Sequence, residues 1–218
     1  MSGFDAVALR ASLAEGVKAL TLTLNDAQLD QMIAYLALLS KWNSVYNLTS
    51  IRDPKEMVKQ HVLDSLSAAP AFKDASNVLD VGAGGGLPGM ILAIVYPHIR
   101  IFMIDTVSKK TAFLNQAKTE LGLSNVTVYT NRVESLQLAD KFDVITSRAF
   151  SELSNFINWS EHLLADGGIY IAMKGVSPDQ EIERMPKGWQ VQKIQPLSVP
   201  GMDAERHLVF IHKTNAEL

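Results

Sequence analysis

LDVGAGGGLPG, residues 79–89, contains five glycines among eleven residues and separates a short apolar run from the segment MILAIVY. Gly82, Gly84 and Gly86 follow Asp80 at alternate positions, in the pattern D-x-G-x-G-x-G. Glycines allow a sharp turn from strand to helix, and they allow a ligand to approach the backbone because no Cβ stands in the way. The stretch therefore predicts a nucleoside-binding loop at the end of a strand.

The sequence on either side of this loop alternates between strand-like and helix-like segments. NVLDV, RIFMI, NVTVY, FDVITS and GIYIAMK are short apolar runs, and amphipathic segments separate most of them. This βαβ rhythm predicts an α/β, Rossmann-like sheet that is mostly parallel. The last two strands, expected at 189–197 and 207–211, have no helix between them, so the sheet should end with an antiparallel strand.

The N-terminal part of the chain predicts helices. Residues 4–20 carry apolar side chains at helical spacing, Asn25 can cap a second helix, and Asp53-Pro54 can open a third that runs to about residue 69. We expect a polar loop over KWNSVYNLTSIRD, residues 41–53. The predicted organisation is a helical cap over 1–70, packed in one compact unit on a core domain over 71–218.

Composition excludes several classes of protein. There is no cysteine, which removes disulfides, thiolate metal sites and a cysteine nucleophile, and the five histidines form no HExxH motif, so we expect no metal. No apolar run is long enough to span a membrane, and the N-terminus does not resemble a signal peptide, so we expect a cytoplasmic protein. The net charge of −3 means that any nucleic acid must be bound by a local basic patch.

An acid at the end of the second predicted strand narrows the choice of ligand. Asp105 lies nineteen residues past Gly86, where a carboxylate can accept hydrogen bonds from both ribose hydroxyls. Pro88 removes a backbone donor that a pyrophosphate would use, and Asp80 adds negative charge. These residues favour S-adenosylmethionine, with its cationic amino-acid end, over NAD. An NAD-dependent oxidoreductase remains the alternative.

Several longer motifs identify a family resemblance. They are KWNSVYNLTSIRDPKEMVKQHVLDSL, LDVGAGGGLPGMILAI, DTVSKKTAFL, NRVE at 131–134 and SRAF at 147–150. On these motifs the chain resembles the bacterial small-subunit ribosomal RNA methyltransferase G family, also called glucose-inhibited division protein B, over nearly its whole length. The resemblance implies methyl transfer from S-adenosylmethionine to N7 of one guanine of 16S ribosomal RNA, near the decoding centre.

The resemblance also implies site residues. It places cofactor contacts on Gly82, Leu87, Val133, Glu134 and Arg148, and it puts Thr106 where serine is expected. With the loop and the second-strand acid, the expected cofactor set is Asp80, Gly82, Gly84, Gly86, Leu87, Asp105, Thr106, Val133, Glu134 and Arg148. The expected partner is 16S ribosomal RNA or the small ribosomal subunit, and we expect a monomer.

Guanine N7 carries a lone pair and no proton, so methylation there needs no general base. We therefore expect catalysis by alignment, with Arg148 positioning the substrate; an ion pair with Asp143 or Glu134 is the structural alternative. His61 and Asp64 share a helix face, and we interpret them as holding the cap to the sheet.

The local basic patch has four candidates, each of which could equally be a solvated surface charge: Lys109, Arg132, Lys174 and Arg206. A third class of function, a non-catalytic RNA-binding factor for ribosome assembly, would retain RNA without turnover.

Overall fold

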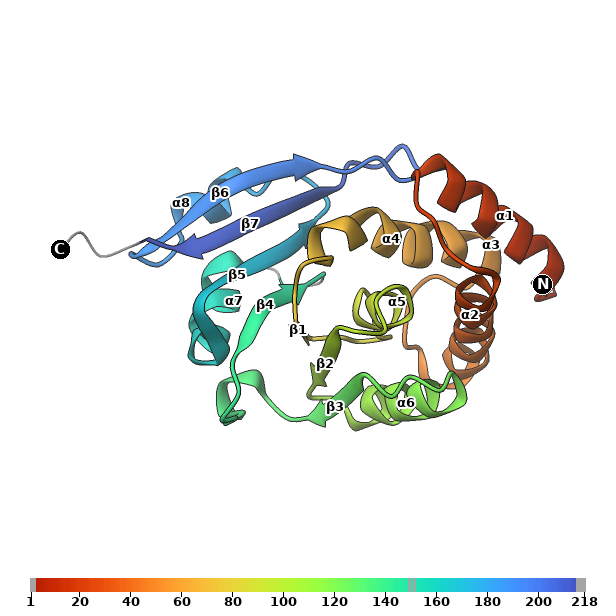
Figure 1. Cartoon of the computed structure of the whole chain (residues 1–218), viewed down its shortest axis with the longest axis horizontal. Coiled ribbons are helices and arrows are strands. Elements are labelled where there is room, and N and C mark those ends of the chain that lie inside the picture. The colour runs from red at the N-terminus through yellow and green to blue at the C-terminus, as the bar shows by residue number, and fades with distance from the viewer. Residues whose placement is uncertain (1–2, 149, 151, 215–218) are drawn as a thin grey trace.

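The computed structural model describes residues 3–148, 150 and 152–214. Within this part of the chain, seven strands form one sheet in the order β3-β2-β1-β4-β5-β7-β6 (Figure 1). Strands β1 to β5 are parallel, and β7 runs antiparallel to both β5 and β6, which confirms the predicted sheet. The strands are β1 (Asn77–Val81), β2 (Arg100–Asp105), β3 (Val126–Thr130), β4 (Phe142–Ser147), β5 (Leu164–Lys174), β6 (Trp189–Pro196) and β7 (His207–Lys213).

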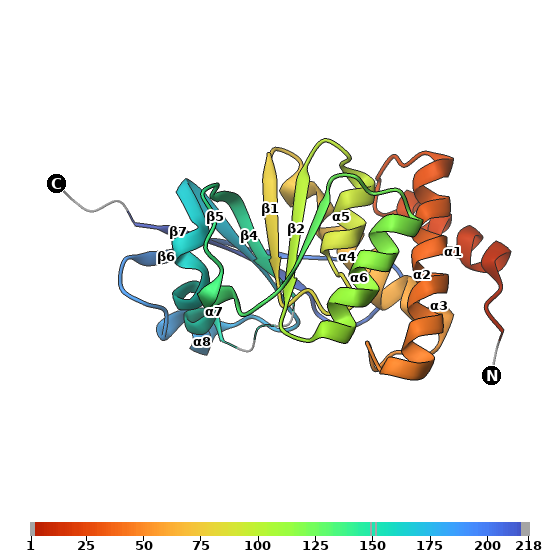
Figure 2. The same ribbon diagram turned by 90° about the horizontal axis from the view of Figure 1, so that it is seen from below.

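Helices lie on both faces of the sheet (Figure 2), and successive strand residues point to opposite sides to meet them. In β1, Val78 packs into a hydrophobic cluster with helices α1, α2 and α4 to α6, whereas Leu79 packs into a second cluster with α7. The helices are α1 (Ala6–Ala19), α2 (Asp26–Tyr46), α3 (Pro54–Met57), α4 (Asp64–Ala68), α5 (Gly89–Val95), α6 (Ser108–Glu120), α7 (Leu153–Ser160) and α8 (Asp179–Glu183).

Both predicted helix caps are confirmed. Asn25 accepts a hydrogen bond from the Gln28 backbone N–H at 2.9 Å, and the Gln28 side chain accepts one from the Asn25 N–H at 3.0 Å. This reciprocal capping box satisfies two donors that the first turn of α2 leaves free. Asp53 accepts from the Lys55 N–H at 2.9 Å, with Pro54 as the first residue of α3.

The predicted loop over residues 41–53 is wrong in its first half. Helix α2 continues to Tyr46, and Asn47 ends it in the left-handed conformation with φ of 52°. The helix extends this far because Trp42 lies on its packed side, where the indole meets the Phe113 ring at a centroid distance of 5.7 Å. The loop begins only at residue 47.

The predicted third helix is not uniformly α-helical. It consists of α3, a π-helical segment η1 (Val58–Leu63), α4, and a 3₁₀ turn η2 (Ala69–Phe72). A π-helical segment fits extra residues into a helix and re-aims the groups that it carries. Here the Gln60 carbonyl in η1 accepts a hydrogen bond from Arg148 Nη1 at 3.2 Å.

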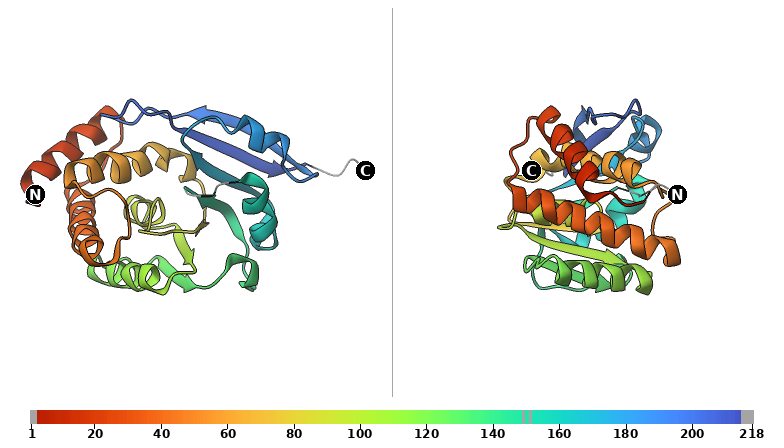
Figure 3. Two further views of the ribbon diagram at one scale, coloured as in Figure 1. Left: turned by 180° about the vertical axis from the view of Figure 1, so that it is seen from behind. Right: turned by 90° about the vertical axis from the view of Figure 1, so that its right-hand side faces the viewer.

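The N-terminal helices and the sheet share one core. A single hydrophobic cluster runs from Leu9 in α1 to Leu208 in β7, and Figure 3 shows the helices from behind and from the side. The fully buried Tyr35 of α2 donates its hydroxyl to the Gly85 carbonyl at 2.6 Å. None of the helices in the described part of the chain has the length and apolar character that crossing a bilayer requires. The domain boundary near residue 70 stays a prediction.

Candidate active site

The glycine loop lies between β1 and α5, as predicted. Gly82, Gly84 and Gly86 have φ angles of +70°, +57° and +89°, which side-chain-bearing residues rarely adopt. A Cβ added at Gly82 would meet no atom within 4 Å, so this glycine borders open space. A Cβ at Gly86 would lie 2.7 Å from both Leu114 and Met90, so Gly86 serves close packing instead.

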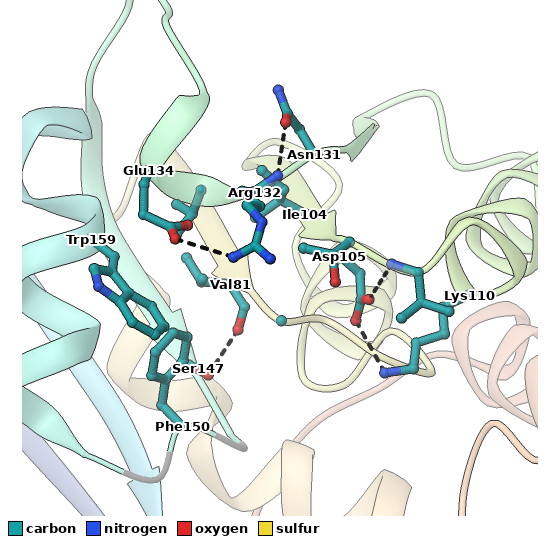
Figure 4. A pocket seen from close by; sticks show the side chains of 14 residues that line it. Val81, Ile104, Asp105, Lys110, Asn131, Arg132, Glu134, Ser147, Phe150 and Trp159 are labelled. Atoms are coloured by element: carbon teal, nitrogen blue, oxygen red, sulfur yellow. Dashed lines mark hydrogen bonds and ion pairs between the residues drawn. The ribbon is translucent and has the colours of Figure 1, made fainter.

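A pocket of about 350 Å³ opens beside this loop, at the carboxyl ends of β1 to β4 (Figure 4). We call it the loop pocket. Its volume lies in the range of small-molecule sites, and its place is where ligands of open α/β sheets bind. It is lined by Val81, Gly82, Ile104, Asp105, Thr106, Val107, Lys110, Asn131, Arg132, Val133, Glu134, Ser147, Phe150 and Trp159. Five of the expected cofactor residues are among these, namely Gly82, Asp105, Thr106, Val133 and Glu134.

Asp105 is held in place by backbone donors. Its Oδ2 accepts from the Gly84 N–H at 3.0 Å, and its Oδ1 accepts from the Val107 N–H at 2.9 Å. Lys110 Nζ lies 3.4 Å from Oδ2, and the side chain of Asp105 is only 6% exposed. Each carboxylate oxygen can accept more than one hydrogen bond, so Asp105 can still receive ribose hydroxyls from the pocket.

Asp80 does not line the loop pocket, in contrast to our expectation. Its side chain is fully buried, and Oδ2 accepts from the Gly89 N–H at 2.9 Å, which satisfies the first free donor of α5. Burial raises the pKa of Asp80 to about 7, and the hydrogen bond from Gly89 opposes that rise. Among the described residues, its Oδ1 has no hydrogen-bond partner. Leu87 is also buried, in the core beneath the loop, and Gly84 and Gly86 are absent from the pocket lining.

The opposite wall of the loop pocket is aromatic. The rings of Phe150 and Trp159 meet edge to face at 5.6 Å, across the pocket from Asp105 and Lys110 (Figure 4). Trp159 is 40% exposed, so part of its ring is available to a flat apolar ligand. Sequence reasoning missed Trp159 and Lys110 as pocket residues. The signal for Trp159 was a large aromatic residue on the helix that follows β4.

Arg132 and Glu134 stand at the rim of the loop pocket. Arg132 Nη1 lies 3.8 Å from Glu134 Oε1. The Arg132 side chain is 75% exposed and the Glu134 side chain is 35% exposed. Sequence reasoning also missed Asn131, whose Oδ1 accepts from the Arg132 backbone N–H at 2.8 Å. The signal for Asn131 was its position directly after β3, where the carboxyl ends of the parallel strands form ligand sites.

Arg148 lines a second, separate pocket of about 370 Å³. We call it the arginine pocket; its lining is Thr49, Ser50, Ile51, Gln60, His61, Asp64, Arg148, Met173, Lys174, Gly175, Leu197, Arg206 and His207. Arg148 Nη1 lies 3.5 Å from Asp64 Oδ2, and Arg206 Nε lies 2.9 Å from Asp64 Oδ1. The structural alternative for Arg148, an ion pair with Asp143 or Glu134, is wrong in its partner, because the ion pair forms with Asp64. Lys174 pairs with Glu181 at 2.7 Å.

The four candidate basic residues do not all line one pocket. Lys174 and Arg206 line the arginine pocket, Arg132 lines the loop pocket, and the exposed Lys109 lines neither. Asp64 joins the helical segment to the segments after β4 and before β7, as the interpretation of a link between cap and sheet required.

Among the residues that the structure describes, His61, unlike Asp64, does not link the helical part to the segments beside the sheet. Its Nε2 lies 2.9 Å from Thr49 Oγ1, which is a contact within the N-terminal helical part. Burial, together with the positive charge of Arg148, lowers the pKa of His61 to about 4, so the ring is neutral at physiological pH.

The loop pocket fits a nucleoside cofactor. Backbone at Gly82 is open to close approach, Asp105 offers acceptor capacity at the end of β2, and Trp159 offers a flat apolar wall. A parallel sheet that ends with β7 inserted antiparallel between β5 and β6, with this loop after β1, defines the class I methyltransferases, which use S-adenosylmethionine.

Structural comparison agrees on the fold. N-methyltransferase NodS from Bradyrhizobium japonicum, in complex with S-adenosyl-L-homocysteine, superimposes with a TM-score of 0.55 at 14% identity, covering 80% of this chain and 98% of that one.

Glycopeptide N-methyltransferase MtfA superimposes with a TM-score of 0.58 at 13% identity, covering 70% and 91% of the two chains. A family model described as rRNA small subunit methyltransferase G matches residues 28–209. The chain is 62% identical to ribosomal RNA small subunit methyltransferase G of Janthinobacterium sp. (strain Marseille), over 98% of this chain and 99% of the relative. It is 59% identical to the protein of that name from Herminiimonas arsenicoxydans, over 98% and 100%. The chain belongs to the rRNA small subunit methyltransferase G family.

Proposed function

We propose that this enzyme transfers a methyl group from S-adenosylmethionine to N7 of a guanine in 16S ribosomal RNA, near the decoding centre. The observation that carries the proposal is the loop pocket, whose lining combines Gly82, Asp105 and an aromatic wall in a chain of this family. The names of the relatives support ribosomal RNA of the small subunit as the substrate. The proposed partner is 16S RNA or the small subunit, and we propose that the protein acts on it as a monomer in the cytoplasm.

In this proposal, Gly82, Asp105, Thr106, Val133 and Glu134 hold the cofactor. When bound, S-adenosylmethionine supplies a methyl group on a positively charged sulfur. The chain's own contribution is to orient the acceptor and to exclude water, because N7 has a free lone pair and loses no proton. The neutral, buried His61 is therefore not required as a base.

Arg148 is the proposed positioning residue for the acceptor. It directly follows Ser147, which lines the loop pocket, while its own guanidinium lines the arginine pocket. A guanidinium can donate to O6 of guanine or to a phosphate. The alternatives of an NAD-dependent oxidoreductase and a non-catalytic assembly factor are not favoured, since the family consists of methyltransferases by name.

Methyl transfer can be tested directly. Purified protein is incubated with tritium-labelled S-adenosylmethionine and either small ribosomal subunits or free 16S RNA, and the label is mapped by nuclease digestion. We expect label at N7 of one guanine. Label only on small molecules, or on an exocyclic amine, contradicts the proposal.

Two variants make the test specific. Arg148→Ala should lower methyl transfer at least tenfold while leaving the affinity for S-adenosylmethionine within about twofold, because its side chain lies outside the loop pocket. Arg100→Ala is the matched control, since Arg100 is the first residue of β2, at the end of that strand away from the loop pocket, and is 56% exposed. Normal methyl transfer by Arg148→Ala would refute its role.

A further inference from the structure

We propose that the arginine pocket is a phosphodiester-binding subsite for the RNA substrate, formed by Arg148 and Arg206 with Asp64 as their common anchor. This inference rests on the proposed function, and it names which cations of the chain contact the RNA backbone. Its starting point is an unequal charge balance. One buried carboxylate faces two guanidinium groups, so the group of three carries an excess of one positive charge.

The remaining hydrogen-bond donors of the two arginines point to an anion. In the described part of the chain, Arg148 donates through Nη1 alone, to Gln60 and Asp64, and Arg206 donates through Nε and Nη1, to Asp64 and Glu205. A guanidinium has five N–H donors, so both arginines keep donors for a further acceptor. Phosphate oxygens match this planar fork better than any neutral acceptor does.

The other cation of the pocket does not add to this excess. Lys174 Nζ contacts both carboxylate oxygens of Glu181, at 2.9 and 2.7 Å, and the carbonyl of Phe150 at 2.9 Å. Its three donors are thereby used within the protein. The pocket therefore has a neutralised side at Lys174 and a cationic side at Arg148 and Arg206.

The position of Asp64 explains how two arginines remain close together. They come from the segments after β4 and before β7, and their like charges would repel each other without an anion between them. Asp64 is only 2% exposed and bonds each arginine through a different oxygen, so it fixes both guanidiniums from the protein side. We infer that Asp64 is a positioning residue and that an RNA phosphate binds the two arginines from the pocket side.

The place of this subsite suits the reaction. Ser147 and Arg148 are consecutive residues at the end of β4, and they line the loop pocket and the arginine pocket respectively. A phosphate held by Arg148 and Arg206 therefore anchors the acceptor strand next to the cofactor. The pocket volume of about 370 Å³ leaves room for a phosphate with its neighbouring sugar.

The test is the salt dependence of RNA binding. Filter binding of 16S RNA is measured from 50 to 300 mM KCl for the wild type, Arg206→Ala, Arg206→Lys and the control Arg100→Ala. Loss of one phosphate contact should reduce the slope of log K against log salt by about 0.7 and weaken binding about tenfold at low salt. Arg206→Lys should restore the slope, because it keeps the charge, but only part of the affinity, because it lacks the fork.

The Asp64→Asn variant tests whether Asp64 positions the two arginines or only stabilises the fold. The variant keeps the shape and removes the negative charge, so RNA should bind at least as tightly at low salt while kcat falls at least tenfold. Calorimetric affinity for S-adenosyl-L-homocysteine should stay within about twofold for all variants, which shows that the loop pocket is intact. An Arg206→Ala variant with the wild-type slope and affinity overturns the inference, as does weaker binding with an unchanged slope.

The labelling experiment on the wild type keeps the two proposals apart. If the wild type methylates its RNA but Arg206→Ala binds RNA normally, only the phosphate subsite is refuted. If the wild type transfers no methyl group to RNA, the proposed function fails whatever the salt slopes are.

Discussion

Replacement of Asp80 by asparagine should change how stability depends on pH. The folded protein raises the pKa of Asp80 from its ordinary 3.8 to about 7, because the carboxyl group is fully buried. An acid with a raised pKa takes up protons on folding, so the free energy of unfolding falls as pH rises from about 4 to about 7. At pH 8 the buried charge costs about 4 kcal/mol relative to a group that stays neutral, since one pKa unit corresponds to about 1.4 kcal/mol.

Asparagine keeps an oxygen for the Gly89 N–H and cannot ionise. Relative to the wild type, the free energy of unfolding of Asp80→Asn should therefore increase by about 3 kcal/mol between pH 5 and pH 8. His61 contributes with the opposite sign, because its lowered pKa stabilises the fold as pH rises from about 4 to 6.5. Since both proteins contain His61, the difference between them removes that contribution.

Urea unfolding, followed by tryptophan fluorescence at half-unit steps of pH, measures this difference. Asp140→Asn is the control, because Asp140 is an exposed acid with 79% of its side chain accessible. The control should track the wild type to within about 0.5 kcal/mol at every pH. If Asp80→Asn also runs parallel to the wild type, Asp80 is ionised in the folded protein without cost, and the reasoning from burial is refuted.

Three further substitutions have clear expected outcomes. Gly86→Ala should lower the free energy of unfolding by about 2–3 kcal/mol in urea, because the left-handed φ and the contacts with Leu114 and Met90 both oppose a Cβ. Trp159→Leu should weaken S-adenosyl-L-homocysteine binding about tenfold by calorimetry, with little effect on stability, since the ring is 40% exposed in the loop pocket. Asn25→Ala should cost about 1 kcal/mol through loss of the capping box, measured by thermal unfolding.

The fold could be predicted because its signals are local. The alternation of strand-like and helix-like segments, and the helix caps at Asn25 and Asp53, depend on residues a few positions apart. Both features are present in the structure. The π-helical segment η1 could not be predicted, because one extra residue barely alters the spacing of apolar positions. Helix α8 has only five residues, and the contact of Glu181 with Lys174 that holds it spans seven positions across a turn.

The part of the candidate site formed by residues at strand ends could be predicted from the sequence. Gly82 and Glu134 follow β1 and β3, and Asp105 is the last residue of β2. The carboxyl ends of these parallel strands lie side by side, so topology alone brings the three residues to the loop pocket. The pairing of charges was not predictable. Asp64 and Arg148 are separated by 84 positions, and nothing in the local sequence of either residue selects the other. The orientation of Asp80 was not predicted either: its carboxyl group accepts a hydrogen bond from Gly89, the first residue of α5, because that N–H has no acceptor within the helix.

The hydrogen bond from Tyr35 to the Gly85 carbonyl ties the glycine loop to helix α2. On the proposed function, a cofactor that orders this loop would also favour the conformation of α2 that keeps the bond, and by thermodynamic reciprocity α2 would favour cofactor binding to the same degree. Substitutions along α2 are then expected to change the affinity for the methyl donor without altering any residue that contacts it.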